Sequence, residues 1–169
     1  MTASVQARVA QIPVGLGEIK YSDNPREALV AFGLGSCVGV AIWARERSLG
    51  ALAHIILPTA GANCRPNENR LKYAEYAVPA MIDELLRRGA TPPELVVRIA
   101  GGAQMLRDVA ASEVFNIGTR NIAQVRHEIR RAGLRIAGED VLGHHGRTMS
   151  LFLSDGRVTI HSAGKTFEI

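Results

Sequence analysis

The chain has 169 residues, of which 47% are hydrophobic and 5% aromatic, and a formal net charge of +4. This length and apolar content predict a single domain over residues 1–169, and the dispersed arginines do not favour nucleic-acid binding. Two cysteines are too few for a disulfide framework, and the first residues lack the apolar core of a signal peptide. The uncharged run at 28–44 is shorter than the ~20 residues of a membrane span, so we expect a cytoplasmic protein without membrane insertion.

The first third of the chain predicts extended structure. Residues 1–12 indicate a weakly ordered lead-in or a first edge strand. Apolar runs rich in Val, Ile and Leu, bounded by glycine and polar turns, predict strands at residues 14–19, 28–34, 38–44 and 49–57. The charged loop at 45–48 joins the last two runs into a hairpin. A polar loop follows at 59–69.

The rest of the chain mixes helices and strands. Apolar residues at three- and four-residue spacing predict two long helices, at 70–88 and 118–132. Further strands are predicted at 95–100, 134–137, 149–153 and 158–161; a short helix is predicted from 101–102 to about 111, and an exposed tail at 162–169. Without regular βαβ alternation, this order predicts an α+β fold, a layered sandwich of mixed β-sheets flanked by helices.

Two side chains with nucleophilic and basic chemistry lie in the first hairpin. Cys37 stands in the turn Gly35-Ser36-Cys37-Val38-Gly39, and His54 lies in an apolar run of the following strand. A thiol becomes a good nucleophile when an imidazole takes its proton. If residues 38–44 pair with 51–57, Cys37 and His54 fall near the same end of the hairpin. The backbone N–H groups around Ser36 are then candidate donors to an oxyanion.

Two other interpretations of these residues remain open at this point. Free cysteine is among the most buried residue types, and a lone histidine on a strand is commonly a hydrogen-bonded core residue. The turn also has the form of a nucleophile elbow with cysteine in place of serine. An elbow leads into a helix and its histidine comes late in the chain, however, whereas here a strand is predicted after the turn.

Several motifs in this order resemble the CheD family of bacterial chemotaxis, the chemoreceptor glutamine deamidases. Leu34-Gly35-Ser36-Cys37-Val38 and His54-Ile55-Ile56-Leu57-Pro58 carry the resemblance. It continues through Lys72-Tyr73-Ala74, Gly101-Gly102-Ala103-Gln104-Met105, Ile117-Gly118-Thr119-Arg120-Asn121, Asp140-Val141 and Gly146-Arg147. The resemblance covers roughly residues 15 to 160.

The resemblance implies an activity, partners and roles for two residues. Cys37 would be the nucleophile and His54 its base in the hydrolysis of glutamine side-chain amides to glutamate. The substrate would be the cytoplasmic helices of methyl-accepting chemoreceptors, and the chemotaxis phosphatase CheC a partner in some bacteria. It also implies a fold akin to the deamidating bacterial toxins, which are cysteine hydrolases.

One departure from the family pattern bears on activity. The family has a threonine six positions before the cysteine, thought to orient the histidine, and this chain has Ala31 there. Leu142 likewise replaces a glycine that usually follows Asp-Val in the family. A base without its orienting partner loses much of its effect. The alternative function is therefore an adaptor that binds chemoreceptors or CheC without efficient catalysis.

No cofactor or metal is predicted. The glycines at 33–35 and 101–102 do not complete a dinucleotide fingerprint or a P-loop. His144 and His145 are adjacent, but no Cys or second carboxylate is spaced to complete a metal site with them. Cys64 has no neighbouring acid, base or partner cysteine and is expected to be incidental. The sequence leaves the oligomeric state open.

Overall fold

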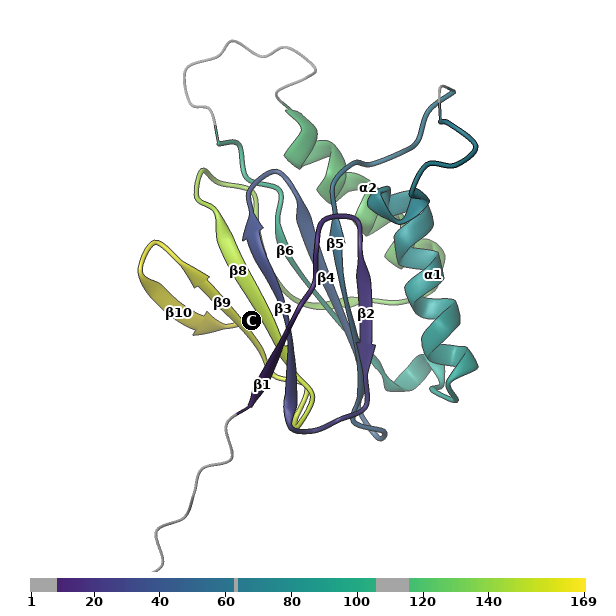
Figure 1. The fold of residues 1–169 in the computed structure, drawn as a ribbon, viewed down its shortest axis with the longest axis vertical. Coiled ribbons are helices and arrows are strands. Elements are labelled where there is room, and N and C mark those ends of the chain that lie inside the picture. Colours follow the sequence, from purple (N-terminus) through teal and green to yellow (C-terminus); the bar gives the residue numbers. More distant parts are fainter. Residues whose placement is uncertain (1–8, 63, 106–115) are drawn as a thin grey trace, which may run out of the picture.

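The described part of the chain forms three layers (Figure 1): two five-stranded sheets stacked face to face, and two helices on the outer face of one sheet. A computed structural model describes residues 9–62, 64–105 and 116–169. The first sheet contains, in spatial order, β1 (Ala10–Pro13), β3 (Glu27–Leu34), β8 (Arg147–Phe152), β9 (Val158–Ser162) and β10 (Lys165–Glu168). The second contains β2 (Ile19–Ser22), β5 (Leu49–Ile55), β4 (Val38–Ala44), β6 (Leu95–Gly101) and β7 (Ile136–Val141).

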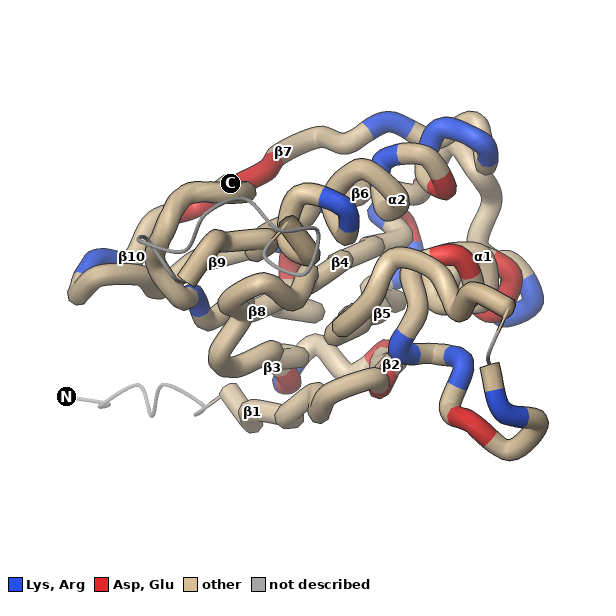
Figure 2. The backbone as a smooth tube through the Cα atoms, turned by 90° about the horizontal axis from the view of Figure 1, so that it is seen from above, with Lys and Arg blue, Asp and Glu red and all other residues tan. Residues whose placement is uncertain are grey.

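Both sheets are mixed. The pairs β1–β3 and β6–β7 are parallel, and the other neighbouring strands are antiparallel. The helices α1 (Ala74–Arg87) and α2 (Ile117–Arg131) cover β4 and β5 of the second sheet, as the view from above shows (Figure 2). Short 3-10 turns occur at Arg70–Lys72 and Pro92–Glu94. No helix in the described part of the chain is long and apolar enough to span a bilayer.

Alternation along β4 and β5 divides the core into two layers. On β4, Val38, Val40 and Ile42 face the helices, whereas Ala41 and Trp43 face the first sheet. Side chains of successive strand residues point to opposite faces, so strands covered on both sides are apolar throughout. We call the space between the two sheets the inter-sheet layer. Because both of its walls are sheets, a polar side chain on either wall is removed from water.

The structure confirms the α+β class and the sandwich of mixed sheets, and it corrects several boundaries. Residues 14–18 form a turn between β1 and β2, not the strand predicted at 14–19. The strand predicted at 134–137 is displaced to Ile136–Val141, where it pairs with β6. Lys165–Glu168 are exposed but paired with β9, so they are not a free tail. Pairing along an edge strand is a long-range contact that local sequence patterns do not reveal.

Two predicted helices also differ. The helix predicted from Arg70 begins at Ala74, because Leu57 pairs with Tyr73 and holds Tyr73 in an extended conformation. Residues 103–105 are irregular where a helix was predicted, and the remainder of that prediction lies outside the described residues. A strand, β4, follows Cys37 directly. The helix that a nucleophile elbow requires is therefore absent at this position.

Candidate active site

Cys37 and His54 lie on the same face of the second sheet, at the end where β3 stops and β4 begins. In the β4–β5 ladder His54 pairs with Gly39. Cys37 lies two residues before Gly39 in the chain. Because residues two apart on a strand share a face, Cys37 and His54 are diagonal neighbours, within reach of larger side chains. Cys37 packs against the core of the inter-sheet layer. The predicted hairpin thus places both residues on one face near one end, and no hydrogen bond joins the Cys37 thiol to His54 Nε2.

The backbone on either side of the cysteine is held from β6. The Gly102 amide donates to the Cys37 carbonyl at 2.8 Å, and the Ala103 amide donates to the Gly35 carbonyl at 2.7 Å. A Cβ at Gly101, whose φ is +113°, would overlap that same Cys37 carbonyl. Only glycine allows the two chains to approach this closely. The glycine pair of the sequence motif therefore positions the backbone of Cys37.

Asn121 holds the same region from α2. It is fully buried, and its Nδ2 donates to the carbonyl oxygens of Ser36 at 2.9 Å and Ile56 at 2.8 Å. One amide thus connects the residue before Cys37 to the strand that carries His54. Gly118 of α2 packs against Gly102 so closely that a side chain at either position would collide with the other's backbone. The helix therefore fixes the turn through both polar and steric contacts.

The His54 imidazole has one backbone partner and one ring nitrogen without a partner. The residue is 3% exposed, and its Nδ1 lies 3.4 Å from the Val14 carbonyl oxygen. A carbonyl only accepts, so this contact requires a proton on Nδ1. Nε2 is buried and has no hydrogen-bond partner among the described residues. A neutral ring in this tautomer has Nε2 free to accept a proton.

The loop that supplies the Val14 carbonyl is fastened to His54 itself. The His54 amide donates to the Glu18 carbonyl at 3.0 Å, and the Gly17 amide donates to the His54 carbonyl at 2.9 Å. The Glu18 carboxylate accepts from the Gly15 amide, and Asn69 donates to the Gly17 carbonyl. These bonds make residues 14–18 a rigid support beside the imidazole.

Burial shifts both groups toward their neutral forms. It raises the pKa of the Cys37 thiol, opposed by that residue's own backbone N–H. It also lowers the pKa of His54, opposed by the Val14 carbonyl. Removal from water disfavours a charged form, which for cysteine is the thiolate and for histidine the imidazolium. At neutral pH the site therefore contains a thiol and a neutral imidazole, the arrangement that suits general-base activation.

Ala31 faces the inter-sheet layer from the first sheet. It is fully buried on β3, beside Met149 of β8, and supplies no hydroxyl to the imidazole. The backbone N–H groups of Ser36 and Cys37 donate to no carbonyl of another described residue. They remain available as oxyanion donors.

Arg147 is a site residue whose role the sequence analysis did not recognise. It is 8% exposed, and its guanidinium reaches the Asp140 carboxylate at 2.5 Å and the carbonyl oxygens of Gly101 and Leu142 at 3.3 and 2.8 Å. It joins β8 of one sheet to β6 and β7 of the other, next to the Cys37 turn. The Asp-Val and Gly-Arg motifs were the available signal for this contact.

Other candidates from the sequence lie apart from this site. Neither adjacent histidine is near a set of ligands: His144 contacts the Gln104 carbonyl at 3.0 Å, and no group of three or more His, Cys, Asp or Glu is arranged for a metal within the described ranges. Cys64 is near Glu68 in the loop before α1 and is not part of the Cys37 turn.

Comparison with known proteins gives related sequences over most of the chain. A family model described as CheD chemotactic sensory transduction matches residues 56–162. A probable chemoreceptor glutamine deamidase CheD of Symbiobacterium thermophilum is 39% identical over 152 residues, covering 90% of this chain and 92% of the relative. Proteins of the same description from Desulforamulus reducens and Archaeoglobus fulgidus are 38% and 36% identical, covering 95% and 89% of this chain and 95% and 92% of their own.

Solved structures give a weaker likeness. Bacillus licheniformis YfiH aligns with a TM-score of 0.45 at 16% identity, covering 82% of this chain and 61% of that one. Neisseria meningitidis NMB0706 aligns with a TM-score of 0.39 at 14% identity, covering 79% of this chain and 60% of its own.

Proposed function

Because the chain belongs to the CheD family of chemotactic sensory transduction proteins, we propose that it hydrolyses glutamine side-chain amides of methyl-accepting chemoreceptors through Cys37 and His54. Its relatives are named as probable chemoreceptor glutamine deamidases, and the substrate here is taken to be the same. The proposed reaction places the protein in the cytoplasm, where thiols stay reduced and the receptors' cytoplasmic helices are accessible.

The chemistry runs in two halves. His54 Nε2 takes the thiol proton as Cys37 Sγ attacks the carboxamide carbon, and the backbone N–H groups of Ser36 and Cys37 stabilise the oxyanion. The intermediate expels ammonia, which leaves with the proton from His54, and a thioester remains. His54 then takes a proton from water, whose oxygen attacks the thioester. Glutamate is released and the thiol is restored.

The single observation that carries this proposal is the pairing of His54 with Gly39. It places an imidazole with an unpartnered, buried Nε2 on the face that also carries Cys37. A histidine that served only as a core residue would satisfy both ring nitrogens, because an unpaired buried polar atom costs about 1–3 kcal/mol. The unpaired atom therefore favours a functional role over packing.

The Val14 carbonyl supports catalysis in the absence of the family's threonine. It lies 3.4 Å from Nδ1 and selects the tautomer in which Nε2 is the base. The anchored loop at 14–18 limits its movement. A backbone acceptor of this kind performs the orienting role that a side-chain partner has in triads. With this acceptor in place, Ala31 need not abolish activity.

The surface around the site suits an amphipathic helix. Leu16, Phe32, Met105 and Leu142 are exposed apolar residues at this end of the sheets. Met105 packs beside Gly35, Leu16 belongs to the loop that contacts His54, and the Leu142 amide donates to the Gly101 carbonyl. Exposed apolar groups near a site indicate a protein partner. We assign this rim to the receptor helix.

An adaptor function is the second candidate. It is favoured by the missing hydroxyl at Ala31, which supplies no side-chain partner to orient His54. In that case the same apolar rim binds chemoreceptors, or the phosphatase CheC, without turnover.

Mass spectrometry of a receptor cytoplasmic fragment separates the two functions. Wild-type protein is expected to add about one mass unit per deamidated glutamine. Cys37→Ala should reduce the rate by at least about a thousandfold, because the nucleophile has no substitute. Cys64→Ala is the matched control and should leave the rate unchanged. Absence of a mass gain with wild type, while the fragment still binds, would establish the adaptor instead.

The substitutions Ala31→Thr and Ala31→Val test whether Val14 is sufficient as the orienting group. Threonine and valine have nearly the same shape, so their difference isolates the hydroxyl. We expect both variants to deamidate within about tenfold of wild type, the residual loss coming from overpacking of a closed core. A rate that rises a hundredfold only with threonine would show that His54 lacks an orienting partner in the native protein.

A further inference from the structure

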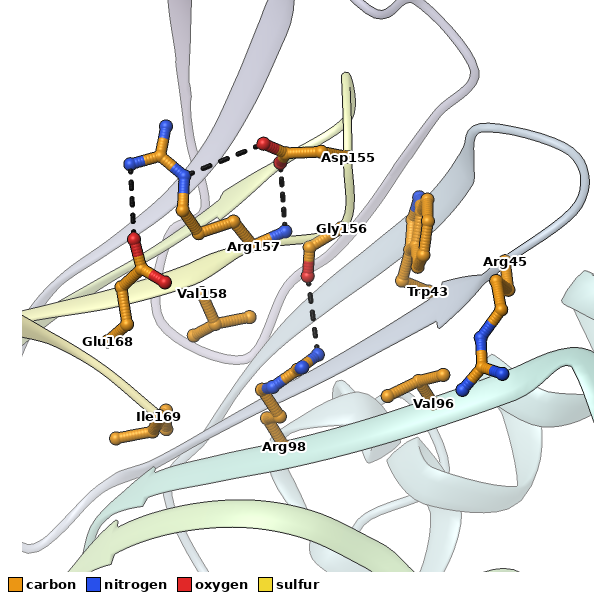
Figure 3. A pocket seen from close by; sticks show the side chains of 10 residues that line it. All are labelled: Trp43, Arg45, Val96, Arg98, Asp155, Gly156, Arg157, Val158, Glu168 and Ile169. Atoms are coloured by element: carbon orange, nitrogen blue, oxygen red, sulfur yellow. Dashed lines mark hydrogen bonds and ion pairs between the residues drawn. The ribbon is translucent and has the colours of Figure 1, made fainter.

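A second polar site occupies the opposite end of the inter-sheet layer. A pocket of about 350 Å³ opens there between the end of β4, the middle of β6 and the turn that joins β8 to β9 (Figure 3). Trp43, Arg45, Arg98 and Arg157 are among its lining residues. Trp43 is six positions along β4 from Cys37, which corresponds to about 20 Å of extended strand. The pocket is therefore separate from the candidate active site.

Arg98 projects from β6 into the inter-sheet layer. It pairs with Ala41, whose side chain lies in that layer, and Arg98 itself is only partly exposed. Its Nη1 donates to the Gly156 carbonyl at 3.3 Å, and its Nε is buried with no partner among the described residues. No carboxylate in the described ranges forms an ion pair with it. A guanidinium keeps its charge, so Arg98, with an unused donor and no ion pair, is able to bind an anion.

Trp43 adds a second unpartnered donor. Its indole Nε1 is buried and has no acceptor among the described residues. Indole N–H groups normally find a partner when they are buried. The Gly156 backbone packs against the ring so closely that any side chain at 156 would overlap it. The turn between β8 and β9 thus packs directly against the Trp43 ring, and it offers no acceptor to the indole Nε1.

Not every arginine around the pocket has a carboxylate partner. The two side-chain carboxylates, Asp155 and Glu168, both pair with Arg157, each at 3.6 Å. Arg45 forms no ion pair with any described residue. In Figure 3, Arg45 and Arg98 stand on either side of Val96. The lining side chains therefore contain three guanidinium groups and two carboxylates, with the terminal carboxylate of Ile169 as a third anion, and the side-chain groups that lack partners are all donors.

We propose that this pocket binds a small oxyanion, with a phosphate or carboxylate group held by Arg98 and Arg45 beside the Trp43 ring. Several acceptor oxygens on one compact anion match the forked donors of arginine. The same anion supplies the counter-charge that Arg98 lacks. It would connect the turn of the first sheet to β4 and β6 of the second and stabilise their packing. This proposal is independent of the reaction at Cys37.

Intrinsic fluorescence reports this site directly, since Trp43 is the single tryptophan of the chain. Sodium phosphate and sodium acetate are titrated separately into the full-length protein at constant ionic strength, with chloride as the compensating salt. We expect a saturable change in Trp43 emission and a rise in the thermal midpoint with at least one of the two anions. The anion that gives the response identifies the ligand as phosphate-like or carboxylate-like.

Variants decide whether the response comes from this pocket. Arg98→Met should raise the apparent dissociation constant about tenfold or more, because a charge-assisted bond is lost while the aliphatic length is kept. Arg26→Met removes the same charge from an exposed residue outside the pocket lining and should leave binding unchanged. Cys37→Ala should bind as wild type does. An equal response in Arg98→Met and wild type, or none with either anion, would overturn the proposal.

Discussion

Two arginines lie at opposite ends of the inter-sheet layer, Arg147 buried and Arg98 partly exposed, and their hydrogen-bond partners differ. Arg147, beside the Cys37 turn, contacts one carboxylate and two backbone carbonyl oxygens. Arg98, beside Trp43, contacts a single carbonyl at 3.3 Å and has a buried Nε without a partner. Both arginines join one sheet to the other. Only Arg147 has the set of partners that a buried guanidinium needs in order to stabilise a fold.

The difference shows how to separate a structural charge from a binding charge. A guanidinium whose donors are already used holds elements together, and its removal leaves other groups unpaired. A guanidinium with unused donors is better suited to a ligand that is not part of the chain. The same reasoning applies to neutral groups: His54 has one partner at Nδ1 and an unused Nε2, and the unused atom is the one assigned to chemistry.

Replacing each arginine by methionine tests this contrast most strongly. Arg147→Met should lower the free energy of unfolding by about 3 kcal/mol, because the Asp140 carboxylate and two carbonyls lose their donor. Arg98→Met should change it by less than about 1 kcal/mol in anion-free buffer, since Arg98 is partly exposed and only one long hydrogen bond is lost. Urea denaturation measures both. Equal losses for the two variants would contradict the contrast.

Alanine at Gly101 tests whether the end that carries Cys37 depends on a close backbone approach. The added Cβ would overlap the Cys37 carbonyl, and neither backbone is free to move. We expect a loss of about 2–3 kcal/mol in the free energy of unfolding together with reduced deamidation. Gly133→Ala is the control, since Gly133 also has a positive φ of +74° but nothing lies within 4 Å of the new Cβ. Its cost should be only about 1 kcal/mol.

The contribution of His54 to the pH dependence of stability is the smallest of these expected effects. Its pKa is lowered in the folded state by burial, so the unfolded chain binds a proton first as the pH falls below about 6.5. Stability is therefore fully present above that pH and declines below it, by at most about 1.4 kcal/mol per pH unit. His54→Gln should remove this part of the decline in urea unfolding measured between neutral and mildly acidic pH. An unchanged slope would mean that His54 titrates normally in the folded protein.

Much of the candidate site could be predicted from local sequence. Cys37 and His54 belong to short motifs within one hairpin, and a hairpin's register follows from its turn and its alternation of faces. The three apolar runs of 28–34, 38–44 and 49–57 likewise predict β3, β4 and β5, because strands buried on both faces are apolar throughout. The two motifs and the three strands depend on residues that are close together in the chain. Their side chains are therefore enough to predict them.

Only the tertiary structure supplied the partners of these residues. The Val14 carbonyl beside His54 is a backbone atom, and every residue has such an atom, so no side-chain pattern marks it. The strand β10, the fully paired Arg147 and the unpaired Arg98 depend on contacts between segments far apart in the chain. The sequence by itself indicated which residues we propose to carry the chemistry. The stacking of the two sheets decided which of their polar atoms acquire partners and which remain free to bind, because only stacking determines what is buried beside them.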